Sequence, residues 1–105
     1  MKGTAHDAVF VELWVSLASL LRSYTSMHGL NGNRQATVEL GEKRITVRHG
    51  DKWLDLSRDV ALVTWRREDG REGRMELMET GRLRTVDREE EMDMAANDWA
   101  QELMA

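Results

Sequence analysis

Two neighbouring strands are predicted most clearly by the stretch RITVRHGDKWLDL, residues 44–56. Ile45 and Val47 alternate with polar residues in its first half, and Leu54 and Leu56 do the same in its second half. Such alternation places the apolar side chains on one face of a strand. A Gly-Asp pair between the two halves is typical of a tight turn. The stretch therefore predicts an antiparallel hairpin with one buried face and one polar face.

Strand-like runs continue on both sides of this hairpin. Together with residues 44–49 and 52–56, they cover residues 36–40, 60–67, 74–79 and 82–86. Asp69-Gly70 gives the strongest turn signal, because Asp-Gly readily adopts the positive φ angles of a hairpin turn. The links between runs are too short for parallel crossovers. We therefore expect an antiparallel meander of five to six strands.

Helical spacing of apolar residues flanks these runs at both ends of the chain. The first predicted helix covers about residues 5–27, and its apolar face contains Phe10, Leu13, Trp14, Leu17, Leu20, Leu21 and Tyr24. The apolar stripe of the second contains Met92, Ala95, Ala96, Trp99 and Leu103. Asp87 and Glu90 are spaced as a capping box at the start of this second helix. We predict one two-layer α+β domain over residues 1–105, with both helices on one face of the sheet.

This order of elements resembles the frataxin-like arrangement, in which two end helices lie on one face of an antiparallel sheet. The likeness is limited to the order of elements. Frataxin-type proteins carry an acidic ridge along the first helix and first strand, whereas the first helix here carries Glu12 among serines. The resemblance therefore implies a fold, and it transfers neither family membership nor an iron site.

Composition narrows the classes of function. A chain without cysteine has no disulfide, thiolate metal site or cysteine nucleophile. A formal charge of −4 argues against general nucleic-acid binding. The most apolar stretch, residues 8–21, is interrupted by Glu12 and is too short to span a bilayer. Since nothing marks the chain as secreted, we expect a cytoplasmic protein that does not contact membranes.

Residues with catalytic or metal-binding spacing are missing from the sequence. His6, His28 and His49 lie far apart, so no helical pair of metal ligands exists. No nucleophile elbow, phosphate-binding loop or dinucleotide fingerprint is present. We therefore predict no catalytic residue, no metal ligand and no cofactor, and we favour a non-enzymatic role.

Charge is distributed unevenly along the chain. Residues 34–84 carry twelve basic and ten acidic groups, whereas residues 85–105 carry one basic and seven acidic groups. Arginine pairs bidentately with carboxylate or phosphate, and tryptophan is enriched at interface anchors. The candidate interaction surface consists of Trp53, Trp65, Arg48, Arg67, Arg71, Arg74 and Arg82. One alternative is that these charges are solvated strand faces joined by ordinary ion pairs. Another is that the acidic run Glu89-Glu90-Glu91, with Asp93, binds a basic protein or a divalent ion.

The first predicted helix is apolar over a wider arc than one sheet requires. Its additional apolar residues include Val11, Val15 and Ala18. Either the helix is broadly covered within a small core, or these three residues face a second subunit. The second interpretation predicts a homodimer.

These observations favour a small non-enzymatic domain that mediates protein–protein interaction or self-association. One alternative is a binder of nucleic acid or another polyanion through an arginine-rich sheet face. The other is a small-ligand carrier or minor enzyme with a pocket between helix and sheet.

Overall fold

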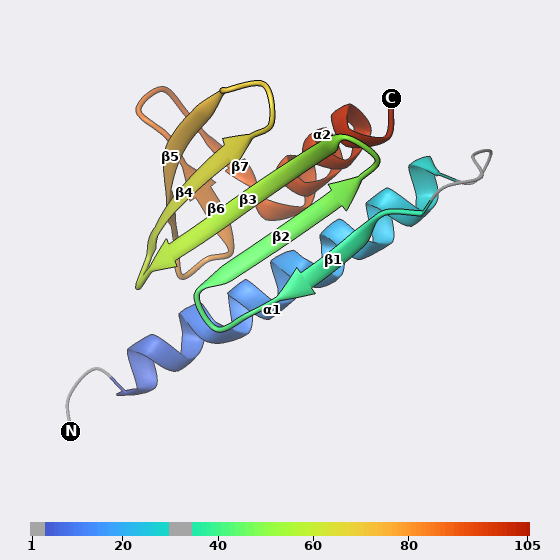
Figure 1. Cartoon of the computed structure of the whole chain (residues 1–105). Coiled ribbons are helices and arrows are strands. Elements are labelled where there is room, and N and C mark those ends of the chain that lie inside the picture. Colours follow the sequence, from blue (N-terminus) through green and yellow to red (C-terminus); the bar gives the residue numbers. More distant parts are fainter. Residues whose placement is uncertain (1–3, 30–34) are drawn as a thin grey trace.

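The computed structural model describes the backbone of residues 4–29 and 35–105, and the side chains of residues 8–29 and 35–105. Within this part of the chain, seven strands form one antiparallel sheet in which spatial order follows chain order (Figure 1). The elements are α1 (Thr4–His28), β1 (Thr37–Leu40), β2 (Arg44–His49), β3 (Lys52–Asp59), β4 (Leu62–Arg67), β5 (Glu72–Leu77), β6 (Arg82–Arg84), β7 (Glu89–Glu91) and α2 (Met92–Met104). The predicted α+β meander between two helices is confirmed.

Both helices lie on the same face of the sheet, and the opposite face is open (Figure 1). The core lies between the layers and includes Trp14, Leu17 and Leu21 of α1, Ile45, Val47, Leu54, Leu56 and Val63 of the sheet, and Ala96, Trp99 and Leu103 of α2. Burial of these side chains supplies the main driving force for folding. The arrangement leaves the polar side of every strand available to solvent or to a partner.

The strand register explains how the two faces differ. Across β2 and β3, Val47 lies opposite Leu54, and both side chains are buried under the helices. The alternate pair, Thr46 opposite Asp55, points to the open face. The hairpin predicted from residues 44–56 is therefore present, with the predicted division into a buried and a polar face.

The end of the meander differs from the prediction. The described residues contain seven strands rather than five to six, because the chain turns back after β6 and forms β7 from Glu89, Glu90 and Glu91. The predicted capping box of Asp87 and Glu90 is wrong, since α2 begins at Met92 and Glu91 at its N-cap makes no side-chain capping bond. Residues 89–91 pair with β6 instead, and the Arg82 guanidinium lies 2.9 Å from the Glu91 carboxylate and 3.5 Å from that of Glu89.

The turn between β3 and β4 also differs from the expected strand over residues 60–67. Val60 has φ 56°, a left-handed conformation that is rare for a β-branched residue. Buried Arg58 holds this turn by donating a hydrogen bond of 3.0 Å to the Val60 carbonyl, and its guanidinium stacks 5.7 Å from the Trp14 ring. The predicted turn at Asp69-Gly70 is confirmed, with Gly70 at φ 93°.

Candidate binding site on the open sheet face

The open face contains a groove of about 670 Å³ that crosses β1, β2, β3 and β4. Four basic and two acidic residues line it, so its formal charge is +2 although the chain as a whole is acidic. The lining residues are Glu39, Arg44, Thr46, Arg48, Gly50, Lys52, Trp53, Asp55 and Arg66. The register brings most of them together, because alternate positions of neighbouring strands share one face. Lys52 is the exception, since it precedes Trp53 directly and its ammonium donates to carbonyls of α2 on the other face.

Asp55 forms the floor of the groove, and three donors from β2 neutralise it. Arg44 donates from Nε at 2.8 Å and from Nη2 at 2.6 Å, and the Thr46 hydroxyl donates at 3.1 Å. The hydrogen bonds from Arg44, aided by that from Thr46, hold the pKa of the Asp55 carboxyl below its usual value. The Asp55 side chain is only 10% exposed, whereas that of Arg44 is 66% exposed. Asp55 is therefore a fixed carboxylate whose charge is already paired.

Two other arginines of the groove are unpaired. Arg48 lies opposite Trp53, and Arg66 lies opposite Asp55 on the other side of β3. Both are exposed, and neither has a hydrogen bond or ion pair with any residue that the structure describes. Because an arginine fork matches a carboxylate or a phosphate, these two side chains can accept an anionic ligand without breaking an internal pair.

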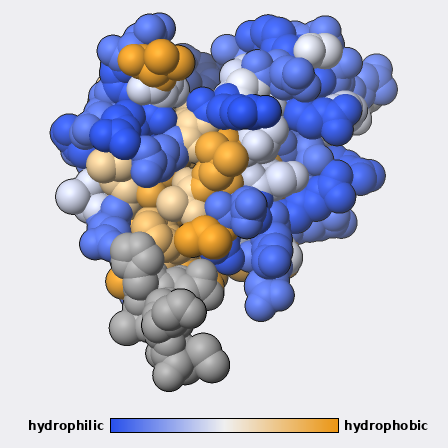
Figure 2. Space-filling view, turned by 90° about the vertical axis from the view of Figure 1, so that its left-hand side faces the viewer, coloured by the Kyte–Doolittle hydropathy of each residue, from blue (hydrophilic) through white to orange (hydrophobic). Residues whose placement is uncertain are grey.

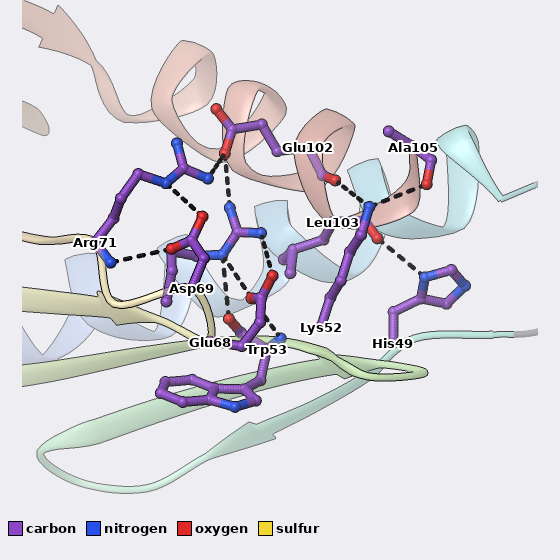
Figure 3. Close-up of polar contacts among 10 residues, drawn as sticks. His49, Lys52, Trp53, Glu68, Asp69, Arg71, Glu102, Leu103 and Ala105 are labelled. Atoms are coloured by element: carbon purple, nitrogen blue, oxygen red, sulfur yellow. Dashed lines mark hydrogen bonds and ion pairs between the residues drawn. The ribbon is translucent and has the colours of Figure 1, made fainter.

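Trp53 stands between these arginines, and its backbone is fixed from the next hairpin. Its N–H donates to a Glu68 carboxylate oxygen at 3.1 Å, and its carbonyl accepts a hydrogen bond of 3.2 Å from Arg67 Nε. Figure 3 shows these contacts, with the Trp53 indole on the side of the sheet away from α2. The side chain is half-buried, so it offers an aromatic surface in a defined position.

Arg67 connects this backbone to α2 on the other face of the sheet. Its side chain is 3% exposed, and Nη1 lies 2.6 Å from a Glu102 carboxylate oxygen that also pairs with Arg71 at 3.1 Å. Lys52 donates to the carbonyl of Glu102 at 3.2 Å, and His49 contacts that of Leu103 at 3.0 Å (Figure 3). Basic groups at a helix C-terminus complement its dipole. The hairpins that carry the groove are thereby tied to α2.

The structure divides the candidate interaction residues between several locations. Arg48, Trp53, Arg74 and Arg82 are on the open face, but only Arg48 and Trp53 line the groove, and Arg82 is paired with β7. Trp65 and Arg67 are on the helix-covered face, where Trp65 packs edge-on against Trp99 with ring centroids 6.4 Å apart. Arg71, in the hairpin, pairs with Asp69 and Glu102. The set therefore does not form one continuous surface.

The candidate interaction surface leaves out Arg44, Asp55 and Arg66, which line the groove. The period of two puts Arg66 and Arg67 on opposite faces of a strand, but it does not indicate which of them the helices cover. Register settles this, because Arg67 lies opposite buried Leu54 and Arg66 lies opposite Asp55.

The candidate self-association residues are also divided. Val11 and Val15 are 38% and 45% exposed, and Leu40 of β1 is 38% exposed. Ala18 is fully buried in the core, so it is not part of an exposed surface. Figure 2 shows that apolar residues also gather on one side of the molecule, between areas of hydrophilic side chains.

Comparison with known proteins adds no functional evidence. No protein family, curated protein or solved structure matches the chain.

Among the described residues, no three Asp, Glu or His side chains form a group that could hold a metal ion. Neither described helix combines the length and apolar character needed to cross a membrane.

Proposed function

We propose that this chain is a non-enzymatic protein-interaction module whose open-face groove binds an acidic segment of a partner protein. The observation that carries the proposal is the pair of guanidiniums of Arg48 and Arg66, which have no hydrogen bond or ion pair with a described residue and lie on the strands on either side of half-buried Trp53. Arginine and tryptophan are the residues most enriched at energetic centres of interfaces. A carboxylate on each side of an apolar residue would match this arrangement.

The form of the groove favours an extended segment over a small ligand. Small-ligand pockets are mostly apolar and bury most of their ligand. This groove is open, crosses four strands and is lined mainly by charged residues. A short stretch of polypeptide can lie along it and contact both arginines.

The surrounding charges favour carboxylates over a nucleic-acid backbone. Glu39 and Asp55 line the groove, and Glu72 lies directly opposite Arg66 on the adjoining strand. A continuous row of phosphates leaving the groove would meet these acidic groups, whereas a short acidic segment needs only the two arginines. A chain without cysteine suits the reducing cytoplasm, where we propose that the module acts.

Fluorescence anisotropy with a labelled oligoglutamate peptide tests this function. Replacing Arg48 or Arg66 with glutamine should weaken binding about tenfold each, or about 1.4 kcal/mol. The matched control is Arg84→Gln, because Arg84 also lies on the open face but is paired with Glu76 outside the groove. Equal affinity of the wild type and the Arg48→Gln/Arg66→Gln variant would overturn the proposal. Tighter binding of a single-stranded oligonucleotide, with an affinity that falls steeply with salt, would indicate a nucleic acid rather than an acidic protein segment as the partner.

Self-association is a second candidate, and the exposure of Val11 and Val15 on α1 favours it. A homodimer through these residues should be dissociated by Val15→Lys, which places a charge in the contact. Sedimentation velocity at high micromolar concentration measures the effect, and a strictly monomeric wild type would remove this candidate.

A further inference from the structure

We infer that Arg44 sets the affinity of the groove for an acidic segment by holding Asp55 away from Arg66, rather than by contacting the segment itself. This inference rests on the proposed function and concerns a positioning residue. Arg44 is not one of the two guanidiniums that the proposal assigns to the ligand.

Asp55 has a basic residue available on each side. Across β2 it is bound by Arg44 through two hydrogen bonds and by Thr46 through one. Across β4 it lies directly opposite Arg66, whose charge also helps to lower the pKa of the Asp55 carboxyl although the two side chains make no hydrogen bond or ion pair. Directly opposed residues of an antiparallel pair are close enough for their side chains to interact. The carboxylate therefore has two competing partners, and the observed arrangement commits it to Arg44.

Without the Arg44 guanidinium, Asp55 would keep its negative charge and lose two of its three donors. The closest remaining cation by register is Arg66, and a cross-strand pair between them would occupy one of the two ligand-binding arginines. The formal charge of the groove would also fall from +2 to +1. An incoming carboxylate would then compete with an internal carboxylate, so affinity falls even though Arg44 makes no contact with the ligand.

The alternative is that Arg44 binds the segment directly, since its side chain is 66% exposed. The double variant Arg44→Gln/Asp55→Asn separates the two explanations. If Arg44 acts through Asp55, neutralising Asp55 leaves Arg66 unpaired and restores binding. If Arg44 contacts the ligand, the double variant remains clearly weaker than the wild type, although its groove has the same formal charge of +2.

The experiment measures binding of the labelled oligoglutamate peptide to the wild type, Arg44→Gln, Asp55→Asn and the double variant. We expect Arg44→Gln to weaken binding about tenfold, and the double variant to return to within about threefold of the wild type. The control, Arg84→Gln, breaks a similar cross-strand pair with Glu76 outside the groove and should leave affinity unchanged. Thermal unfolding of each variant verifies that it is folded.

A measurement without peptide separates this inference from the proposed function. The Nε–H signal of Arg66 in ¹⁵N NMR should exchange slowly with water in Arg44→Gln, because it becomes paired, and rapidly in the wild type and the double variant. If the wild type binds no peptide, the proposed function fails, and this signal still decides the role of Arg44. Unchanged Arg66 exchange in Arg44→Gln would overturn the inference, as would a double variant that binds no better than Arg44→Gln.

Discussion

Replacing Arg67 with methionine should destabilise the fold far more than replacing an exposed arginine. Arg67 is 3% exposed and donates to the Trp53 carbonyl, to Glu68 and to Glu102. Methionine keeps much of the buried stem but removes every donor, so the Trp53 carbonyl loses this hydrogen bond. The change therefore acts where β3, the turn between β4 and β5, and α2 meet.

The exposure of its partners sets the size of the effect. Breaking a fully buried ion pair costs about 3–5 kcal/mol, because a charge is left unpaired in the interior. Here the Glu68 and Glu102 side chains are 23% and 49% exposed, so water can still hydrate them. We therefore expect Arg67→Met to lower the free energy of unfolding by about 2–3 kcal/mol, chiefly through the lost carbonyl bond and the lost bonds to charged groups.

Urea unfolding followed by tryptophan fluorescence measures this change, and Arg84→Met is the matched control. Arg84 and its partner Glu76 are each 49% exposed, so their pair should contribute less than about 0.5 kcal/mol. The reasoning is refuted if Arg67→Met lies within about 0.5 kcal/mol of the wild type, or if the two variants are equally destabilised.

Three further predictions concern stability. Val60→Gly should stabilise the protein by about 1 kcal/mol and raise Tm by roughly 4–8 °C, because glycine relieves the left-handed strain; an unchanged or lower Tm would contradict this. Gly73→Ala should destabilise by about 1–3 kcal/mol in urea unfolding, because a Cβ there would lie 2.6 Å from Trp65 Nε1; wild-type stability would show that the indole moves freely. The pKa of the Asp55 carboxyl in the folded protein is lowered mainly by Arg44. The ionised carboxylate therefore stabilises the fold above the pKa of an unfolded aspartate, about 3.9, and this stabilisation is lost as the pH falls through the lower pKa of the folded state. The difference in stability between the wild type and Asp55→Asn should therefore be constant from about pH 7 to 5 and shrink below about pH 4, and a difference that grows on acidification would contradict the assignment.

The architecture was predictable because the hydrophobic period changes twice along the chain. The hairpin over residues 44–56 follows from strict alternation, and the same rule assigns Leu54 and Asp55 to opposite faces. The strand Glu89–Glu91 was not predictable in this way, because three consecutive glutamates have little strand propensity. It depends on pairing with β6 and on the ion pairs of Arg82, which become apparent only once the register is known.

The groove was only partly predictable for a related reason. Valine at φ 56° gives no turn signal in the sequence, so the register between β3 and β4 could not be derived. That register decides that Arg66 joins the groove while Arg67 is buried against α2. The sequence also does not show that the Asp55 carboxylate is hydrogen-bonded to Arg44, whereas Arg66 has no hydrogen bond or ion pair with a described residue.

The central claim is that an acidic segment binds beside Trp53 on the open sheet face, and the indole N–H signals in a ¹H–¹⁵N NMR titration test it most directly. The chain has four tryptophans, of which Trp14, Trp53 and Trp99 report separate places in the fold, whereas Trp65 packs against Trp99. The Trp14 indole is bound to the Gly41 carbonyl at 3.2 Å, and Trp99 is buried in the core. On addition of oligoglutamate peptide, the account predicts that the Trp53 signal shifts while those of Trp14 and Trp99 remain unchanged. An unchanged Trp53 signal, or shifts confined to α1 around Val11 and Val15, would contradict it.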